Sequence, residues 1–329
     1  MSGVRSLVVT ADEKGLRLDR WFRRHFPELT HGHLEKLLRK GEIRIDGQRA
    51  KAGLRLEAGQ RIRVPPFKGS AKPAPSRAHP PVSAADAKAL RQRVLYKDDD
   101  ILAIDKPAGL AVQGGTKTMH HLDGMLDALC FEKKERPRLV HRLDKETSGV
   151  LVLARTAGAA ARLAAAFRGK TIRKVYWALV RGVPKPEEGE VALPLAKRAV
   201  GGGEQVIADD EGKRARTFYT VLDKAGRKTA WLALMPLTGR THQLRVHCAA
   251  LGTPILGDNK YGGPEARFEG EGIADRLHLH AAEIELPHPK KGRLRITAPL
   301  PEELRASWVA FGFDPASPAT PFRDFSEQQ

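Results

Sequence analysis

The first 66 residues carry apolar positions whose spacing changes from helical to alternating. One helix is predicted before Pro27, where apolar residues recur three and four positions apart: Leu18, Trp21, Phe22 and Phe26. Thr30 is the expected N-cap of a second helix that ends at Gly41, with apolar positions Leu34, Leu37 and Leu38. Ile43 and Ile45 then alternate up to Asp46-Gly47, which predicts a hairpin, and residues 54–66 predict a further pair of strands.

A proline-rich stretch separates this segment from the rest of the chain. Among small polar residues stand Pro66, Pro73, Pro75, Pro80 and Pro81, a composition that favours a semi-extended linker without a core. We therefore predict a small domain at 14–66, a linker at 67–93, a larger domain at 94–313 and a loose tail at 314–329.

In the larger domain the apolar runs are short and predict many strands. They are, in order, ILAIDKP (101–107), VLVLA (150–154), VYWALVRG (175–182), ARTFYTVL (215–222), TAWLALMPL (229–237) and RLRITAPL (293–300). One helix is predicted at 157–168, where alanines dominate. Strands outnumber helices without a regular βαβ alternation. We therefore expect an α+β fold, with a small α/β module followed by a mixed, mainly antiparallel sheet.

The excess of basic side chains indicates the kind of partner that the chain binds. The 329 residues include 57 Lys and Arg against 39 Asp and Glu, which gives a net charge of +18 and a pI near 10.1. Residues 1–70 alone hold 16 basic and 8 acidic side chains, so this segment is a basic module in its own right. A polyanion, above all nucleic acid, is the expected partner. Membrane binding is not expected, because the chain has neither an 18-residue apolar run nor a free basic amphipathic end.

Motifs for metals and cofactors are missing from the sequence. Cys130 and Cys248 form neither a disulfide framework nor a zinc site, and without a secretory signal they indicate a reducing cytoplasm. Walker A, GxGxxG, HExxH and GxSxG patterns do not occur. The histidines of LHLH, His278 and His280, alternate with leucines along a predicted strand. They are expected to make hydrogen bonds rather than to bind a metal.

The nonapeptide HRLDKETSG, residues 141–149, is the most concentrated group of titratable side chains before a buried strand. Two interpretations of Asp144 are open on spacing alone. It could belong to a charged turn that precedes the apolar run VLVLA, which is the commoner case. It could instead be a carboxylate at the mouth of a pocket, kept anionic by Arg142 and Lys145 for work as a nucleophile or general base.

Four motifs in this order resemble the RluA-type pseudouridine synthases. They are HRLDKETSGVLVLAR (141–155), KVYWALVRG (174–182), TGRTHQLRVHCAALGTPILGDNKYGG (238–263) and LHLHAAEIELPHP (277–289). The stretch RLDRWFRRHFPELTHGHLEKLLRKGEIRIDGQRA (17–50) resembles the S4 RNA-binding module. With ILAIDKPAGLAVQGG (101–115) it is similar to the RluC-like branch, which acts on large-subunit ribosomal RNA. Gln113 is a departure, since that branch commonly has histidine there.

The resemblance implies roles for individual residues. Asp144, Tyr176 and Arg240 are expected to be catalytic, with Tyr176 against the target base and Arg240 paired with Asp144. Arg142, Thr147, His242 and Arg245 are expected to bind substrate. The S4-like module is expected to bind RNA through Arg17, Arg20, Lys36, Arg39, Lys40 and Arg44.

The implied function is isomerisation of specific uridines to pseudouridine in 23S ribosomal RNA, by a monomer that needs no metal, redox cofactor or nucleotide. The uridine is flipped out of the RNA before its N1–C1′ bond is exchanged for C5–C1′. Two alternatives stay open. The same chemistry could act on another RNA, such as tRNA or a different ribosomal stem-loop. The chain could also be a non-catalytic RNA-binding or ribosome-assembly factor that keeps the fold.

Overall fold

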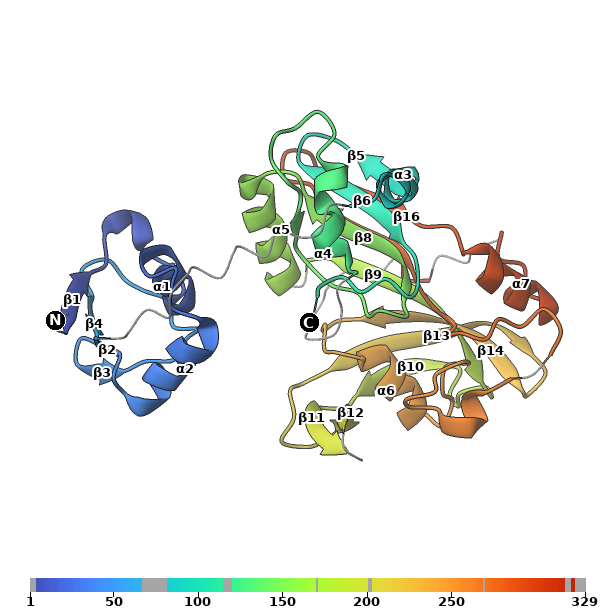
Figure 1. Cartoon of the computed structure of the whole chain (residues 1–329). Coiled ribbons are helices and arrows are strands. Elements are labelled where there is room, and N and C mark those ends of the chain that lie inside the picture. The colour runs from blue at the N-terminus through green and yellow to red at the C-terminus, as the bar shows by residue number, and fades with distance from the viewer. Residues whose placement is uncertain are drawn as a thin grey trace. The chain divides into compact units, whose positions relative to one another are not determined.

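The computed structural model describes residues 4–66, 82–114, 120–169, 171–200, 203–268, 270–316 and 321–322. The chain divides into two units, Met1–His79 and Pro80–Gln329, and each is described by itself (Figure 1). Within the described residues no helix combines the length and the apolar character needed to cross a membrane.

The N-terminal unit contains the two helices and the hairpin that the sequence predicts. Helix α1 spans Leu18–His25 and helix α2 spans His31–Lys40. Thr30 caps α2 by accepting a hydrogen bond from the His33 N–H at 3.4 Å, and Gly41 ends it at a φ of 72°. The turn between β2 (Arg44–Ile45) and β3 (Gln48–Arg49) has φ values of 49° at Asp46 and 80° at Gly47. Both values are positive, as a type I′ hairpin requires.

The prediction of two strands in residues 54–66 is wrong in part. Only Arg61–Val64 forms a strand, β4, and its neighbours are β1 (Arg5–Val8) and β2, so the sheet order is β1-β4-β2-β3. The backbone from Leu54 to Leu56 instead bonds to the residues before α1. Leu18 N donates to Leu54 O and Leu56 N to Leu16 O, each at 2.8 Å. These partners are distant in sequence, which a local apolar pattern cannot indicate.

The second unit is built on one large mixed sheet of 10 strands (Figure 1). Its main path runs β10-β13-β14-β9-β15-β8-β6-β5, while β16 pairs with β15 and β7 with β8. The strands are β5 (Val94–Lys97), β6 (Ile101–Lys106), β7 (Arg138–Leu139), β8 (Ser148–Ala154), β9 (Arg173–Arg181), β10 (Glu188–Ala192), β13 (Arg216–Ala225), β14 (Thr229–Pro236), β15 (Leu279–Pro287) and β16 (Arg293–Thr297). Among the described strands only β15 and β8 pair in parallel. The predicted α+β class with a mainly antiparallel sheet is confirmed.

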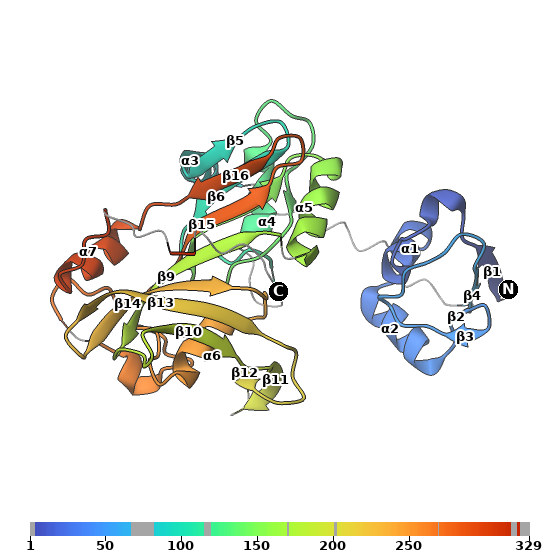
Figure 2. The ribbon, with the colours of Figure 1, turned by 180° about the vertical axis from the view of Figure 1, so that it is seen from behind.

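Helices cover both faces of the sheet, as Figures 1 and 2 show from opposite sides. They are α3 (Ala84–Gln92), α4 (Leu122–Met125), α5 (Ala157–Gly169), α6 (Gln243–Ala250) and α7 (Glu302–Ala310), and this unit also has 3-10 turns at Leu126–Leu129 and Gly263–Ala266; a third, Ala11–Glu13, belongs to the N-terminal unit. A separate hairpin pairs β11 (Leu195–Val200) with β12 (Gly203–Ala208).

Strand β8 explains the unbroken apolar run VLVLA. Its Leu151 and Leu153 pack in one cluster with Leu90 of α3 and Leu122 of α4, whereas Val150 and Val152 pack in another with Leu163 of α5. Both faces of the strand are therefore covered, and every residue from Ser148 to Ala154 is buried.

The predicted linker is too long at its C-terminal end. Residues 84–92 form α3, which begins at its cap Ser83 and buries Leu90 against the sheet. The proline-rich part, 67–81, lies outside the described residues, as does most of the predicted tail. A weakly apolar helix next to a proline-rich stretch gives too little hydrophobic contrast for its packing to be recognised in the sequence.

Candidate active site

The HRLDKETSG segment crosses from β7 to β8 and holds Asp144 in a turn, in which the Thr147 N–H donates to the Asp144 carbonyl at 3.2 Å. Gly149 fixes the start of the buried strand. Its φ is +109°, and a Cβ placed there would lie 2.3 Å from the Ala281 carbonyl oxygen on the parallel neighbour β15. Only glycine fits at this position. Both interpretations of the segment therefore hold structurally: it leads into a buried strand, and it places a carboxylate at a fixed point.

Buried Lys106 at the end of β6 stabilises the turn that carries Asp144 through hydrogen bonds to backbone carbonyls. Its ammonium donates to the carbonyls of Pro107 at 2.7 Å, Leu110 at 2.9 Å and Lys145 at 3.0 Å. Burial lowers the pKa of Lys106 to about 7, although Glu146 and Asp144 favour its charged form. The carbonyls replace the water that a buried ammonium has lost.

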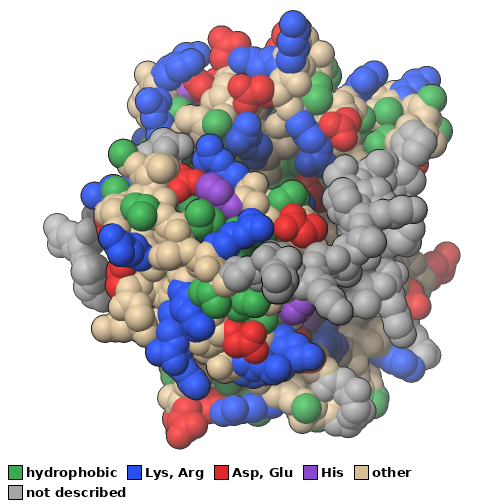
Figure 3. Space-filling model, turned by 60° about the vertical axis from the view of Figure 1, so that its left-hand side comes forward, with side chains coloured by type: hydrophobic (Ala, Val, Ile, Leu, Met, Phe, Trp, Pro, Cys, Tyr) green, Lys and Arg blue, Asp and Glu red, His purple; other side chains and the backbone are tan. Residues whose placement is uncertain are grey.

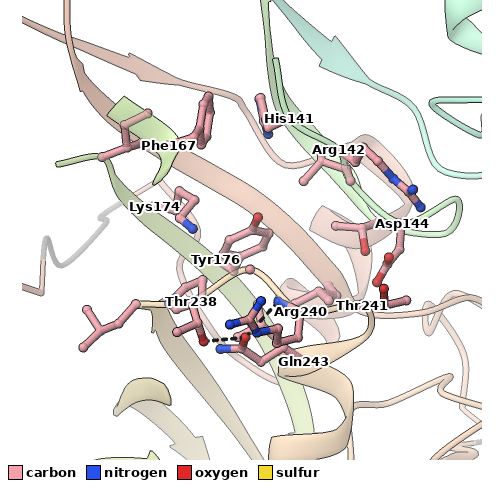
Figure 4. A pocket seen from close by; sticks show the side chains of 18 of the residues that line it. His141, Arg142, Asp144, Phe167, Lys174, Tyr176, Thr238, Arg240, Thr241 and Gln243 are labelled. Atoms are coloured by element: carbon pink, nitrogen blue, oxygen red, sulfur yellow. Dashed lines mark hydrogen bonds between the residues drawn. The ribbon is translucent and has the colours of Figure 1, made fainter. Parts of the chain in front are cut away.

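Asp144 lies on the wall of a cleft of about 790 Å³. Figure 4 shows the Asp144 and Arg142 side chains on one side of this space, Tyr176 in the middle, and Phe167 with His141 on the other side. Six of the predicted site residues line the cleft: Arg142, Asp144, Thr147, Tyr176, Arg240 and Arg245. Gln113, where the sequence departs from the RluC-like pattern, lines it too.

His242 lies next to the Asp144 carboxylate, with 4.0 Å between Nε2 and Oδ1. Its ring is oriented from the other side by Tyr261, whose hydroxyl lies 2.6 Å from Nδ1. The same hydroxyl oxygen accepts a hydrogen bond from the Val206 N–H of β12 at 3.3 Å. A hydroxyl that donates to Nδ1 leaves the ring hydrogen on Nε2, directed toward Asp144.

Tyr176 and Trp177 point to opposite sides of β9, as the alternation of a strand requires. Tyr176 lines the cleft, whereas Trp177 packs edge to face on Trp231 with ring centroids 5.2 Å apart. Burial and the nearby Asp144 charge raise the pKa of Tyr176, so the phenol is neutral at physiological pH.

The expected pairing of Arg240 with Asp144 is not present in this structure. Arg240 Nε donates instead to the Arg214 carbonyl at 3.1 Å. Its backbone is held by buried Gln243, whose amide oxygen accepts from the Arg240 N–H at 3.1 Å and from the Thr238 hydroxyl at 2.7 Å. Arg240 still lines the same cleft as Asp144 (Figure 4).

Arg245, which was predicted to bind substrate, is paired with Asp258 in this structure. Its guanidinium makes two hydrogen bonds to the carboxylate of buried Asp258, at 2.8 and 2.6 Å. The same carboxylate accepts from the backbone of Lys260 and Tyr261, each at 3.1 Å. Arg245 therefore holds the turn that carries Tyr261 through its Nε and Nη2 donors, while it also lines the cleft.

His141 is a neutral hydrogen-bond acceptor. Its Nε2 accepts from the Val152 N–H of β8 at 2.8 Å, and its ring stacks on Phe167 with centroids 4.6 Å apart. Burial, with a smaller effect of Lys174, lowers the pKa of His141 to about 3. The predicted hydrogen-bonding histidines are confirmed as well: His278 contacts Leu256 O and Ser307 Oγ, and His280 contacts Ser148 Oγ and Ala298 O.

Sequence reasoning missed several of these residues, although most lie inside the motifs that it used. Gln243 and Tyr261 stand in TGRTHQ and GDNKYGG, and Lys106 stands in IDKP, but their partners are far away in sequence. Lys174 could have been found, because it precedes Tyr176 by two residues on a strand and must therefore face the same side.

The six predicted RNA-binding residues of the N-terminal unit are all exposed on its surface. Arg17 is paired with Asp19 at 2.6 Å, Arg44 donates to the carbonyls of Gly41 and Gly47, and Lys40 lies 3.6 Å from Glu42. Arg20, Lys36 and Arg39 belong to α1 and α2. Lys and Arg side chains are spread over much of the face in Figure 3, with Asp and Glu among them.

These features define a class of protein. A strongly basic chain carries a cleft whose wall includes a carboxylate, a neutral phenol and a guanidinium, and this is a site for acid–base or nucleophilic chemistry on a polyanionic substrate. Among the described residues no group of three His, Cys, Asp or Glu side chains is placed to hold a metal ion.

Known proteins identify the family. The model of the family described as RNA pseudouridylate synthase matches residues 100–250. Ribosomal large subunit pseudouridine synthase C of Escherichia coli (strain K12) is 37% identical over 310 residues, which cover 92% of this chain and 95% of that protein. The protein of the same name from Vibrio cholerae is 38% identical over 314 residues, with the same coverage. The solved structure of human RNA pseudouridylate synthase domain containing 4 is 31% identical, with a TM-score of 0.60, and covers 69% of this chain and 96% of that one.

The chain therefore belongs to the RNA pseudouridylate synthase family. It is an RNA pseudouridine synthase, an isomerase that converts uridine to pseudouridine.

Proposed function

We propose that this enzyme converts specific uridines of 23S ribosomal RNA to pseudouridine, with Asp144 as its catalytic carboxylate. The observation that carries the proposal is the position of Asp144. It lies on the wall of the cleft that also contains Tyr176 and Arg240. The likeness to two ribosomal large subunit enzymes over 92% of the chain supports ribosomal RNA as the substrate.

The reaction requires the uridine to leave the RNA stack. Flipping costs a few kcal/mol, and contacts of the flipped nucleotide with the cleft offset this cost. The uracil then lies against Tyr176, and the sugar faces Asp144. The Asp144 carboxylate either attacks C1′ or removes the C2′ proton, and both routes release the base from C1′ within the closed site. The base turns and C5 bonds to C1′, while the bond from Asp144 to C1′ breaks or C2′ takes its proton back, and the C5 proton is lost to solvent.

Other cleft residues support this sequence of events. Exposed Arg142 lies two positions before Asp144, where it can contact a phosphate or enter the space that the uridine leaves. Arg240 lines the cleft beside a loop held by Gln243, and its guanidinium is proposed to pair with Asp144 once RNA is bound. His242 orients the carboxylate, and buried Thr147 shapes the turn that carries it.

The N-terminal unit is proposed to add affinity for RNA. Its helix–helix–hairpin layout and its exposed basic side chains fit an S4-like module that binds phosphates and contributes little sequence reading. The enzyme is proposed to act as a monomer in the cytoplasm, where its two free cysteines stay reduced.

Substrate identity is tested by mapping pseudouridines in cells that lack the gene. The proposal predicts that specific 23S positions revert to uridine and that the purified enzyme restores them in a 23S transcript. Loss of pseudouridine from tRNA or from the small subunit alone, with 23S unchanged, would reject ribosomal large-subunit RNA and leave the isomerase activity standing.

A further inference from the structure

Lys174 is a cleft residue to which the mechanism above assigns no task. It belongs to β9 and lines the cleft together with Tyr176, two residues further along the same face of the strand. Figure 4 shows its ammonium group directed into the cleft beside the Tyr176 ring. The residue is half-buried, and Phe167 and Ile172 line the same cleft.

The ammonium of Lys174 has no protein acceptor among the described residues, and burial alone lowers its pKa, to about 8. Buried Lys106 differs, because three carbonyls accept its hydrogens. An ammonium held partly out of water without an acceptor is costly, so it is expected to have a partner that arrives with the substrate.

The charged and titratable groups around Lys174 restrict what that partner is. In the cleft they are His141, Arg142, Asp144, Arg168, Tyr176, Arg240 and Arg245. Burial keeps His141 and Tyr176 neutral, the arginines are cations, and Asp144 already lies beside His242. Negative charge is therefore lacking on the Lys174 side of Tyr176, where the target base lies in the proposed function.

We propose that Lys174 stabilises the negative charge that develops on uracil when the N1–C1′ bond breaks. Heterolysis leaves the bonding electron pair on the base, whose anion is delocalised over N1, O2, C5 and O4. C1′ is left either as an ester of Asp144 or, after loss of the C2′ proton to Asp144, as part of a double bond to C2′. As C5 bonds to C1′, either the C1′–O ester bond breaks and frees the Asp144 carboxylate, or C2′ takes its proton back from Asp144. The C5 proton is then released and N1 takes up a proton, so the reaction is balanced without a cofactor.

The charge of Lys174 has a second consequence. A detached uracil must stay in the cleft while it turns, and an ion pair with a fixed cation retains it without fixing one orientation. Lysine suits this task, because its ammonium is a point charge with rotatable donors, whereas arginine presents a planar fork. The inference rests on the proposed position of the base.

The test compares Lys174→Met and Lys174→Arg with the wild type in single-turnover assays on a 23S transcript that contains uridine labelled with tritium at C5. Loss of one preorganised electrostatic donor typically slows the chemical step about 10²- to 10³-fold. We expect that loss for Lys174→Met, with RNA affinity unchanged and most of the rate recovered in Lys174→Arg. Lys228→Met, which removes one exposed charge remote from the cleft, is the matched control.

Two further measurements separate this role from a structural one. The rate should fall as pH rises through about 8, where the ammonium of Lys174 deprotonates, and this fall should move to higher pH in Lys174→Arg. The second measurement follows the rate of N1–C1′ cleavage on RNA that contains 5-fluorouridine, whose base leaves more readily as an anion. On this RNA the rate of Lys174→Met should be closer to the wild-type rate than it is on RNA with uridine.

The inference is overturned if Lys174→Met keeps the wild-type rate, or if it only weakens RNA binding and lowers the salt slope, as removal of a phosphate-binding cation does. Equal rate losses in Lys174→Met and Lys174→Arg would assign Lys174 to packing and overturn it too. A wild-type enzyme that releases no tritium from any RNA would overturn the proposed function instead, so the two failures are distinguishable.

Discussion

His242 stands in a backbone conformation that residues other than glycine seldom adopt, with φ 53° and ψ 19°. Such a residue costs about 1–3 kcal/mol and tends to occur where surrounding contacts impose it at a functional site. Here the contacts are the hydroxyl of Tyr261 on one ring nitrogen and the Asp144 carboxylate near the other. The strain is consistent with a ring positioned for Asp144.

Tyr261→Phe is predicted to reduce the rate constant of isomerisation about tenfold, because the His242 ring loses the group that sets its tautomer and angle. The free energy of unfolding should fall by about 1 kcal/mol for the missing hydrogen bond. Tyr96→Phe is the matched control: its hydroxyl donates to Asp98 at 2.8 Å outside the cleft. It should lose similar stability at an unchanged rate. Equal rates for both variants would argue against a role for Tyr261 in the site.

At the scale of elements, the parallel pairing of β8 with β15 determines where Asp144 lies. Gly149→Ala is predicted to destabilise the second unit by several kcal/mol, because the new Cβ would meet the Ala281 carbonyl and a φ of +109° is unfavourable for alanine. Gly158→Ala in α5 has open space around it and should stabilise the unit by about 0.5–1 kcal/mol. Urea unfolding of both variants measures the difference, and similar midpoints for the two would contradict this account of the turn.

The sequence predicts elements well where burial is one-sided or complete. The apolar runs that became β6, β9, β13 and β14, and the capping signals of α2, indicate their elements without tertiary information. Strands β11 and β12 were missed because β11 is largely exposed and neither strand has the contrast between faces that marks a strand in the sequence. Asp144 itself could be selected only by resemblance, since a charged turn before a strand has many structural uses. The orientation of Arg245 toward Asp258 depends on a turn 13 residues away, which spacing cannot reveal.

At the scale of the molecule, the two units should respond differently to acid. Burial lowers the pKa of His141 to about 3 and those of His247, His278 and His280 to about 4, while the same groups titrate near 6.5 when unfolded. Between pH 6.5 and 4 the unfolded chain therefore binds more protons, and each histidine can lower stability by up to about 1.4 kcal/mol per pH unit.

The N-terminal unit depends on a group that also loses stability in acid, but only at lower pH. Burial of Glu13 opposes its ionisation, yet hydrogen bonds from His25, Trp21 and Thr10 lower its pKa to about 2. Its contribution is complete above pH 4.5 and is lost only as pH falls through about 2. Hydrogen exchange of the full chain at pH 7, 5 and 4, corrected for intrinsic rates, should show the second unit opening first. Simultaneous opening would contradict this prediction.

RNA affinity should depend on the exposed cations of α1 and α2. Replacing Arg20, Lys36 and Arg39 by Gln should weaken binding to a 23S transcript and reduce the slope of log K against log salt by about 0.9 for each phosphate that is no longer neutralised. Arg44→Gln is the comparison, because that side chain already donates to two carbonyls of its own unit and should change the slope less. An unchanged slope in the triple variant would count against the S4-like assignment.

The most direct test of the central claim measures tritium release from C5-labelled uridine in a 23S transcript by the wild type, Asp144→Asn and Glu146→Gln. Each pseudouridine formed expels one C5 hydrogen, so release counts turnovers. Glu146 is exposed, lies 3.8 Å from Lys145 and does not line the cleft, which makes it the matched carboxylate control. We predict release by the wild type and Glu146→Gln, and a loss of at least about 10⁴-fold in Asp144→Asn with RNA binding retained. Wild-type release by Asp144→Asn would contradict the account.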